Sequence, residues 1–359
     1  MRKAILLFSI FILTYCTGSC QTNKPTDAQL RLIYGYSNAL PVGTQFAVGL
    51  IENGETKFYG IIRQGDSAVY LDNRNAVFEI GSISKVFTST LLANLALEGK
   101  LNLDDNINNY IDWTLNDKAK ITFKQLASHT SGLPRMPTNF REVSELSPEN
   151  PYKYYTEEKL KTYVTEQMYL TKGKKRKYNY SNVGAGLLGY VLTEIEGKPY
   201  KSILLEKVLF KYGMTSTTTN RALFDNRLVK GLDANGQEVS NWDLGALVGA
   251  GGILSTVEDL SKFAKAQFNP DNRELAMTRE RVADASWKMD IGLGWHIINS
   301  KSDPFVWHNG GTLGYKSSMA VHAEKKSAVI VLSNASAFNK KSNNIDGLCF
   351  DLMKTLINP

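Results

Sequence analysis

The sequence has few cysteines, which excludes a fold held together by disulfides. Only Cys16, Cys20 and Cys349 occur in 359 residues. If residues 1–19 leave as an export signal and Cys20 carries a lipid, Cys349 is the only free thiol, so no disulfide framework forms. Cys349 lies in IDGLCFDLMKTLI, whose helical spacing predicts a buried side chain. Stability must come from a large core, which 43% hydrophobic residues can supply at this length.

Motifs for metals and for one common class of hydrolase are also missing. The four histidines, His129, His296, His308 and His322, show neither HExxH nor another recognisable metal spacing, so we expect no metal and no other cofactor. His129 is expected to be structural. No Gly-x-Ser-x-Gly motif occurs, which argues against an α/β-hydrolase. The segment GAGLLG at 184–189 fits the dinucleotide fingerprint but follows polar residues instead of an apolar strand, so we expect no nucleotide there.

The net charge of +7 is modest for a chain of this size. Its densest basic patch is KGKKRK, Lys172 to Lys177, which we interpret as a solvated loop. The patch lacks the interleaved aromatic residues of nucleic-acid readers. We therefore expect no nucleic-acid partner.

The first 19 residues have the pattern of an export signal. A short basic segment, MRK, precedes the apolar run AILLFSIFILTYC, and small residues lead into Cys20. This resembles a bacterial lipoprotein signal, which implies a lipidated Cys20, membrane attachment and a location in the periplasm or cell envelope. Thr17 stands where such signals usually have leucine, so ordinary cleavage near Ser19 or Cys20 stays open.

Strand patterns at both ends of the chain predict one antiparallel sheet. TQFAVGLIE and KFYGIIRQG are joined by Asn53-Gly54, a strong hairpin signal, and SSMAVHA and SAVIVLSN are separated by a charged turn. Residues 20–40 read as a tether and the start of the first helix. The predicted fold is α+β: an antiparallel-sheet domain, residues 41–100 plus 245–359, flanked by helices, with a mainly helical domain, 101–244, inserted in it.

A serine three residues before a lysine is the first candidate for chemistry. In EIGSISKVFTS, Ser82 follows a glycine at the predicted start of a buried helix, and Lys85 lies one turn further on the same face. A serine hydroxyl needs a neighbour that takes its proton, and burial lowers the pKa of a lysine enough for that task. Roughly one Ser-x-x-Lys match is expected by chance in such a chain, so an ordinary helix cap stays open on this motif alone.

Two later motifs occur in the order that one hydrolase family requires. Together with FEIGSISK, the segments YSN at 180–182 and HNGGT at 308–312 resemble the class C β-lactamase and penicillin-binding-protein family of serine hydrolases. GKLNLDD, LASHTSGLP, AGGILSTVEDLSKF and IGLGW extend the resemblance from about residue 40 to 335. The resemblance implies the β-lactamase/transpeptidase-like fold, and hydrolysis of an amide or ester through an acyl-enzyme.

The resemblance also implies catalytic roles. Ser82 would be the acylated nucleophile, Lys85 its proton-handling partner and Tyr180 the general base. A phenol acts as a base near neutral pH only if its pKa is lowered, and we expect a charged Lys85 to lower it.

Substrate-binding roles follow from the same resemblance. Asn182, His308 and Gly310 would contact the substrate, and the backbone N–H groups of Ser82 and Gly311 would form the oxyanion hole. His308 stands where β-lactamases usually carry lysine, so a fixed positive charge for a substrate carboxylate is missing at that position.

The sequence therefore predicts a monomeric serine hydrolase with a small-molecule or peptidoglycan-like substrate. β-Lactams, D-amino-acid peptides and small esters all present a carbonyl to the same oxyanion hole, so β-lactamase, DD-carboxypeptidase and esterase activities stay open. A protein of another class, a catalytically silent envelope protein that binds peptidoglycan, is a further alternative.

Overall fold

The computed structural model describes residues 24–170, 177–224, 226–299 and 303–358. The predicted export signal, Cys20 and all of the KGKKRK patch except Lys177 lie outside these ranges. Within them, no helix combines the length and the apolar character that a membrane crossing requires.

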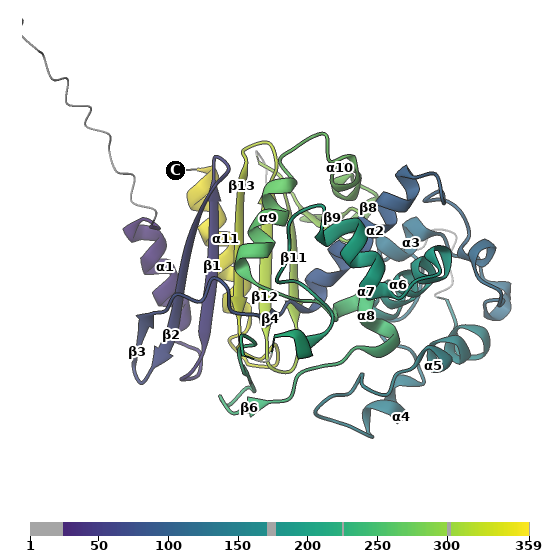
Figure 1. Cartoon of the computed structure of the whole chain (residues 1–359), viewed down its shortest axis with the longest axis horizontal. Helices are drawn as coiled ribbons and strands as arrows, with labels where there is room; N and C mark the ends of the chain where they lie inside the picture. The colour runs from purple at the N-terminus through teal and green to yellow at the C-terminus, as the bar shows by residue number, and fades with distance from the viewer. Residues whose placement is uncertain (1–23, 171–176, 225, 300–302, 359) are drawn as a thin grey trace, which may run out of the picture.

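A nine-stranded antiparallel sheet is the largest element of the described chain (Figure 1). Its strands, in spatial order, are β3 (Ser67–Tyr70), β2 (Glu55–Gln64), β1 (Gln45–Glu52), β13 (Ser327–Ser333), β12 (Lys316–His322), β11 (Phe305–Gly311), β10 (His296–Ile298), β9 (Met289–Ile291) and β8 (Ala283–Ser286). Strand β1 pairs with β13, from Phe46 opposite Ser333 to Ile51 opposite Ala328. Segments from the two ends of the chain thus share one sheet.

The β1–β2 hairpin forms as its turn sequence predicts. Asn53 and Gly54 both have positive φ, 51° and 84°, as a type I′ turn requires. Asparagine and glycine adopt this left-handed region more readily than other residues. The turn fixes the register, with Glu52 opposite Glu55.

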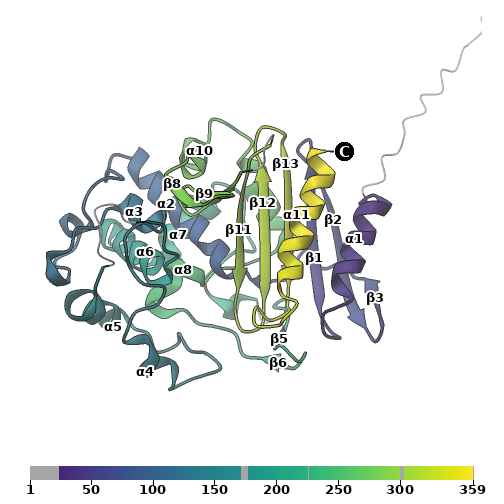
Figure 2. The same ribbon diagram turned by 180° about the vertical axis from the view of Figure 1, so that it is seen from behind.

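Helices cover both faces of the sheet. Helices α1 (Asp27–Ser37) and α11 (Asn343–Ile357) pack together on one face (Figure 2), where Ile33, Leu348 and the free thiol of Cys349 are buried. The predicted burial of Cys349 is confirmed. Helix α9 (Val257–Ala266) lies on the opposite face, against β1 and β13 (Figure 1).

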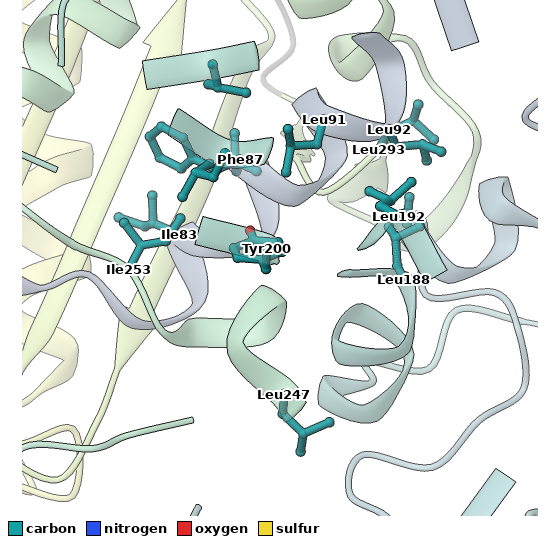
Figure 3. Close-up of a cluster of buried hydrophobic side chains, with 14 of the residues drawn as sticks. Ile83, Phe87, Leu91, Leu92, Leu188, Leu192, Tyr200, Leu247, Ile253 and Leu293 are labelled. Atoms are coloured by element: carbon teal, nitrogen blue, oxygen red, sulfur yellow. The ribbon is translucent and has the colours of Figure 1, made fainter. Parts of the chain in front are cut away.

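Helix α2 (Ser84–Leu97) runs through the centre of the molecule, directly after the 3₁₀ turn η1 (Gly81–Ile83). Apolar side chains surround it in Figure 3, and its Phe87 ring stacks on Phe263 of α9 at a centroid distance of 4.4 Å. The helix ends at Leu97, and Gly99 follows with φ of 71°. A helix that is apolar all round must be buried, as the sequence predicted.

Seven further α-helices lie in the described ranges. They are α3 (Phe123–Ala127), α4 (Phe140–Ser144), α5 (Glu157–Thr162), α6 (Asn182–Glu196), α7 (Tyr200–Leu204), α8 (Val248–Gly251) and α10 (Arg273–Arg279). Two small ladders join β4 (Phe78–Glu79) to β7 (Leu254–Ser255) and β5 (Gly231–Leu232) to β6 (Glu238–Val239). The predicted fold class, α+β with an antiparallel sheet flanked by helices, is confirmed.

The spacing in KQLASHTSGLP predicts a helix over the segment, but only its first residues are helical. The helix stops at Ala127, and His129 takes a left-handed φ of 57°. The backbone carbonyl of His129 there accepts a hydrogen bond from the Asn179 N–H at 2.8 Å. A contact with a segment 50 residues away therefore replaces the continuation of the helix.

Gly54 in the turn and Gly35 in α1 allow a matched test of backbone conformation. A Cβ at Gly54 or at Gly35 of α1 would meet no atom within 4 Å, but only Gly54 has positive φ. We expect Gly54→Ala to lower the free energy of unfolding by about 1 kcal/mol. Gly35→Ala is the control, and we expect it to raise that energy by about 0.5 kcal/mol. Urea unfolding measures both, and equal effects would contradict the turn geometry.

Candidate active site

Ser82 and Lys85 meet at the point where the chain enters α2. The Lys85 Nζ lies 2.9 Å from the Ser82 Oγ and donates a hydrogen bond to the Ala250 backbone carbonyl at 2.6 Å. Only 2% of Lys85 is exposed. Burial, and then the charge of Arg135, hold the pKa of the Lys85 amine well below its usual value. Burial therefore favours the uncharged form of the amine beside Ser82.

Tyr180 lies against the same lysine. The Lys85 Nζ is 4.9 Å from the centre of its ring, and the phenol interacts with the Ser82 side chain. Burial raises the pKa of the Tyr180 phenol, against a smaller lowering by Ser82 and by the Arg135 charge. The expectation that a charged Lys85 lowers this pKa is wrong, because burial of Lys85 favours its uncharged form. The phenol is protonated in this site.

The helix start at α6 fixes the position of Tyr180. Ser181 caps the helix: its hydroxyl accepts from the Gly184 N–H at 2.9 Å and donates to the Pro134 carbonyl at 2.7 Å. Asn182 is the first residue of α6, half-buried, with its amide nitrogen 3.5 Å from the Met136 sulfur. In the YSN motif, Tyr180 and Asn182 thus lie on either side of Ser181, the N-cap of α6.

Glycines allow the nucleophile segment to touch strand β11. A Cβ at Gly310 would lie 1.9 Å from the Ile80 carbonyl oxygen, and one at Gly81 would lie 2.6 Å from the Gly311 nitrogen. Ser317 of β12 strengthens the contact by donating to the same Ile80 carbonyl at 2.8 Å. The backbone around Ser82 and the backbone of Gly311 therefore lie side by side.

His308, predicted to contact substrate, is fully buried in β11. Its Nδ1 lies 2.7 Å from the Asn309 carbonyl oxygen, which makes Nδ1 the protonated nitrogen of the neutral ring. Burial, followed by the influence of His296 and Lys85, holds the pKa of His308 well below its usual value. His308 therefore brings no positive charge to the site.

The comparison with known proteins agrees with this geometry. A family model described as Beta-lactamase matches residues 46–348. The chain belongs to the beta-lactamase family.

Individual relatives of this beta-lactamase-family chain are distant. A D-alanyl-D-alanine-carboxypeptidase/endopeptidase, AmpH, of Escherichia coli is 25% identical, with 96% of this chain and 95% of that protein covered. A beta-lactamase of Pseudomonas fluorescens is 27% identical over 70% of this chain and 68% of its own length. The crystal structure of a beta-lactamase/D-alanine carboxypeptidase from Yersinia pestis, complexed with citrate, has a TM-score of 0.72 and 25% identity, covering 93% of this chain and 100% of its own.

Sequence reasoning did not assign the neighbours of Tyr180. The ring of His129 lies 4.4 Å from the Tyr180 ring, and His296 lies 5.0 Å from His308. The Tyr178 hydroxyl is 2.9 Å from His296 Nε2. His129 occurs in LASHTSGLP and His296 directly follows IGLGW, two segments that carried the family resemblance, so these segments were a signal for proximity to the site. No group of three or more His, Cys, Asp or Glu side chains in the described ranges is arranged to hold a metal.

The buried histidines make stability depend on pH. Burial lowers the pKa of His296 from 6.5 to about 4, and lowers those of His129 and His308 as well. Between pH 6.5 and 4 the unfolded chain binds protons that the folded chain does not. The free energy of unfolding therefore falls as the pH falls, by about 1.4 kcal/mol per pH unit for His296 alone.

We expect His296→Gln to reduce this slope. Glutamine retains a partner for the Tyr178 hydroxyl and does not titrate. Urea unfolding at a series of pH values between 4.5 and 7, on the wild type and the variant, measures the difference. Parallel curves for the two proteins would contradict a neutral, buried His296.

Proposed function

We propose that this chain is a serine hydrolase that transfers an acyl group from an amide or ester to Ser82 and then to water. The observation that carries the proposal is the buried Lys85 amine, 2.9 Å from the Ser82 hydroxyl and with a pKa held well below its usual value. A serine with such a partner is activated for nucleophilic attack. Membership of a serine-hydrolase family supports the same reaction.

In the proposed acylation, the lone pair of Lys85 accepts the Ser82 proton as Oγ bonds to the substrate carbonyl carbon. The N–H groups of Ser82 and Gly311 stabilise the resulting oxyanion. Tyr180 donates its phenolic proton to the leaving group as the scissile bond breaks, and the Lys85 ammonium returns a proton to the phenolate. Both residues then have their starting forms, and the net transfer is one proton from Ser82 to the leaving group.

In the proposed deacylation, Lys85 accepts a proton from a water molecule that attacks the ester, and Ser82 recovers it when the acid leaves. The amine serves both steps because burial favours its uncharged form. β-Lactams, peptides ending in D-amino acids and small esters are the candidate acyl donors. The predicted export signal supports a location in the cell envelope, where peptidoglycan fragments are available.

Labelling of Ser82 tests the proposal directly. We expect incubation with penicillin or a nitrophenyl ester to give either a mass increase equal to the acyl group or turnover. Ser82→Ala should abolish both, while Ser144→Ala, at a half-buried position of α4, should leave both unchanged. Intact-mass spectrometry and product absorbance are the measurements. A silent binding protein would show neither adduct nor turnover in the wild type.

The protonation states predict different phenotypes for Lys85 and Tyr180. Lys85→Met should slow acylation by about a thousandfold or more on every substrate, since the base is lost. Tyr180→Phe should slow amide cleavage about a hundredfold more than nitrophenyl-ester cleavage, because a nitrophenolate leaves without a proton. For the wild type, kcat/KM should fall as the pH falls and Lys85 becomes protonated.

Steady-state kinetics with one amide and one nitrophenyl ester separate the two roles. The opposite pattern would identify Tyr180 as the base: equal losses on both substrates in Tyr180→Phe, with only a mild loss in Lys85→Met. Circular dichroism and urea unfolding of each variant check that the fold is retained.

A further inference from the structure

The side chain of Arg135 is an unbalanced positive charge beside the reacting groups. Its guanidinium carbon lies 5.1 Å from the centre of the Tyr180 ring, and the residue is exposed. In the described ranges, no carboxylate forms an ion pair with Arg135, and no hydrogen bond involves its side chain. Arg141, six residues further, shows the usual arrangement, with Glu145 at 2.9 Å.

The backbone holds Arg135 in place at the start of α6. Its carbonyl oxygen accepts hydrogen bonds from the Asn182 N–H at 2.9 Å and the Val183 N–H at 3.3 Å. The preceding carbonyl, of Pro134, accepts from the Ser181 hydroxyl. The residue that carries the guanidinium is thus anchored next to the YSN motif, and only the side chain remains to be ordered by a ligand.

These hydrogen bonds also occupy the helix end. The first N–H groups of α6 are bonded to Arg135 and, at Gly184, to the Ser181 hydroxyl. A helix N-terminus attracts anions through free N–H groups, and these three are not free. The backbone at the start of α6 therefore has no free donor among these three N–H groups, and the Arg135 guanidinium beside it can donate hydrogen bonds to an anion.

The charge of Arg135 acts on the catalytic groups themselves. After burial, the Arg135 charge is the second cause of the lowered pKa of Lys85. The same charge offsets part of the rise that burial causes in the pKa of Tyr180. Lys85 and Arg135 contact the same tyrosine ring, at 4.9 Å and 5.1 Å from its centre. An anion bound by the guanidinium would consequently lie close to the scissile carbonyl of a substrate at Ser82.

We propose that Arg135 binds a carboxylate of the acyl donor and so supplies the positive charge that His308 does not. This inference rests on the proposed function and specifies its substrate class: amides or esters that carry a free carboxylate a few bonds from the scissile carbonyl. The C-terminal residue of a peptide has this chemistry. A planar guanidinium suits it, because its parallel N–H groups bond both carboxylate oxygens.

Two pairs of esters test the proposal. In one pair, 3-acetoxybenzoate and its methyl ester, the carboxylate lies on the leaving group. In the other, mono-nitrophenyl succinate and its methyl ester, it lies on the acyl group. For each pair, the quantity measured is the kcat/KM of the acid divided by the kcat/KM of its methyl ester. In the pair whose carboxylate reaches the guanidinium, we expect Arg135→Gln to lower this ratio about tenfold, the effect of losing one hydrogen bond to a charged group.

Two further variants control for nonspecific effects. Arg135→Lys keeps the charge and should retain most of the ratio, while Arg141→Gln removes an exposed arginine of the same region and should leave the ratio unchanged. Added salt should lower the wild-type ratio and have little effect on that of Arg135→Gln.

The outcomes separate this inference from the proposed function. If the wild type cleaves the neutral esters but Arg135→Gln changes neither ratio, Arg135 does not bind the carboxylate and the serine hydrolase proposal stands. If the wild type cleaves none of the four esters, and no acyl adduct forms on Ser82, the proposed function fails and this inference fails with it.

Discussion

Removal of the Lys85 amine from water is the interaction on which the site depends. An exposed lysine is charged at neutral pH and cannot accept a proton from serine. Here the amine lies at the base of a helix that is buried on all sides, and its polar contacts are the Ser82 hydroxyl and the Ala250 carbonyl. The apolar character of α2 therefore has a chemical consequence as well as a structural one: it determines the protonation state of the residue next to the nucleophile.

The sheet and the glycines place the second half of the site. Because β1 pairs with β13, strands from the end of the chain lie beside those from its start, and β11 reaches the segment that carries Ser82. Side chains at Gly81 or Gly310 would separate the two backbones. The close approach brings the backbone of Gly311 to the segment that carries Ser82, so this part of the site depends on backbone shape alone.

Much of this arrangement was predictable from local patterns, and the errors have a common cause. The hairpin at Asn53-Gly54, the buried helix after Ser82 and the cap at Ser181 each depend on neighbouring residues. The length of α3, the backbone conformation of His129 and the protonation of Tyr180 depend instead on residues far apart in the sequence. Helix α3 ends before His129, whose carbonyl accepts a hydrogen bond from a segment 50 residues away. The pKa of Tyr180 reflects burial by residues from several elements. Neither effect is present in a local pattern.

The sequence by itself determined the fold class and the family, because motif order and hydrophobic periodicity are properties of the chain. It also singled out Ser82, Lys85 and Tyr180 as the candidate catalytic residues. Tertiary structure alone decided in which direction the pKa values of Lys85 and Tyr180 shift. It also placed Arg135, which no motif singled out, over the Tyr180 ring. Charge and solvation depend on distances between residues far apart in the chain, and only folding sets those distances.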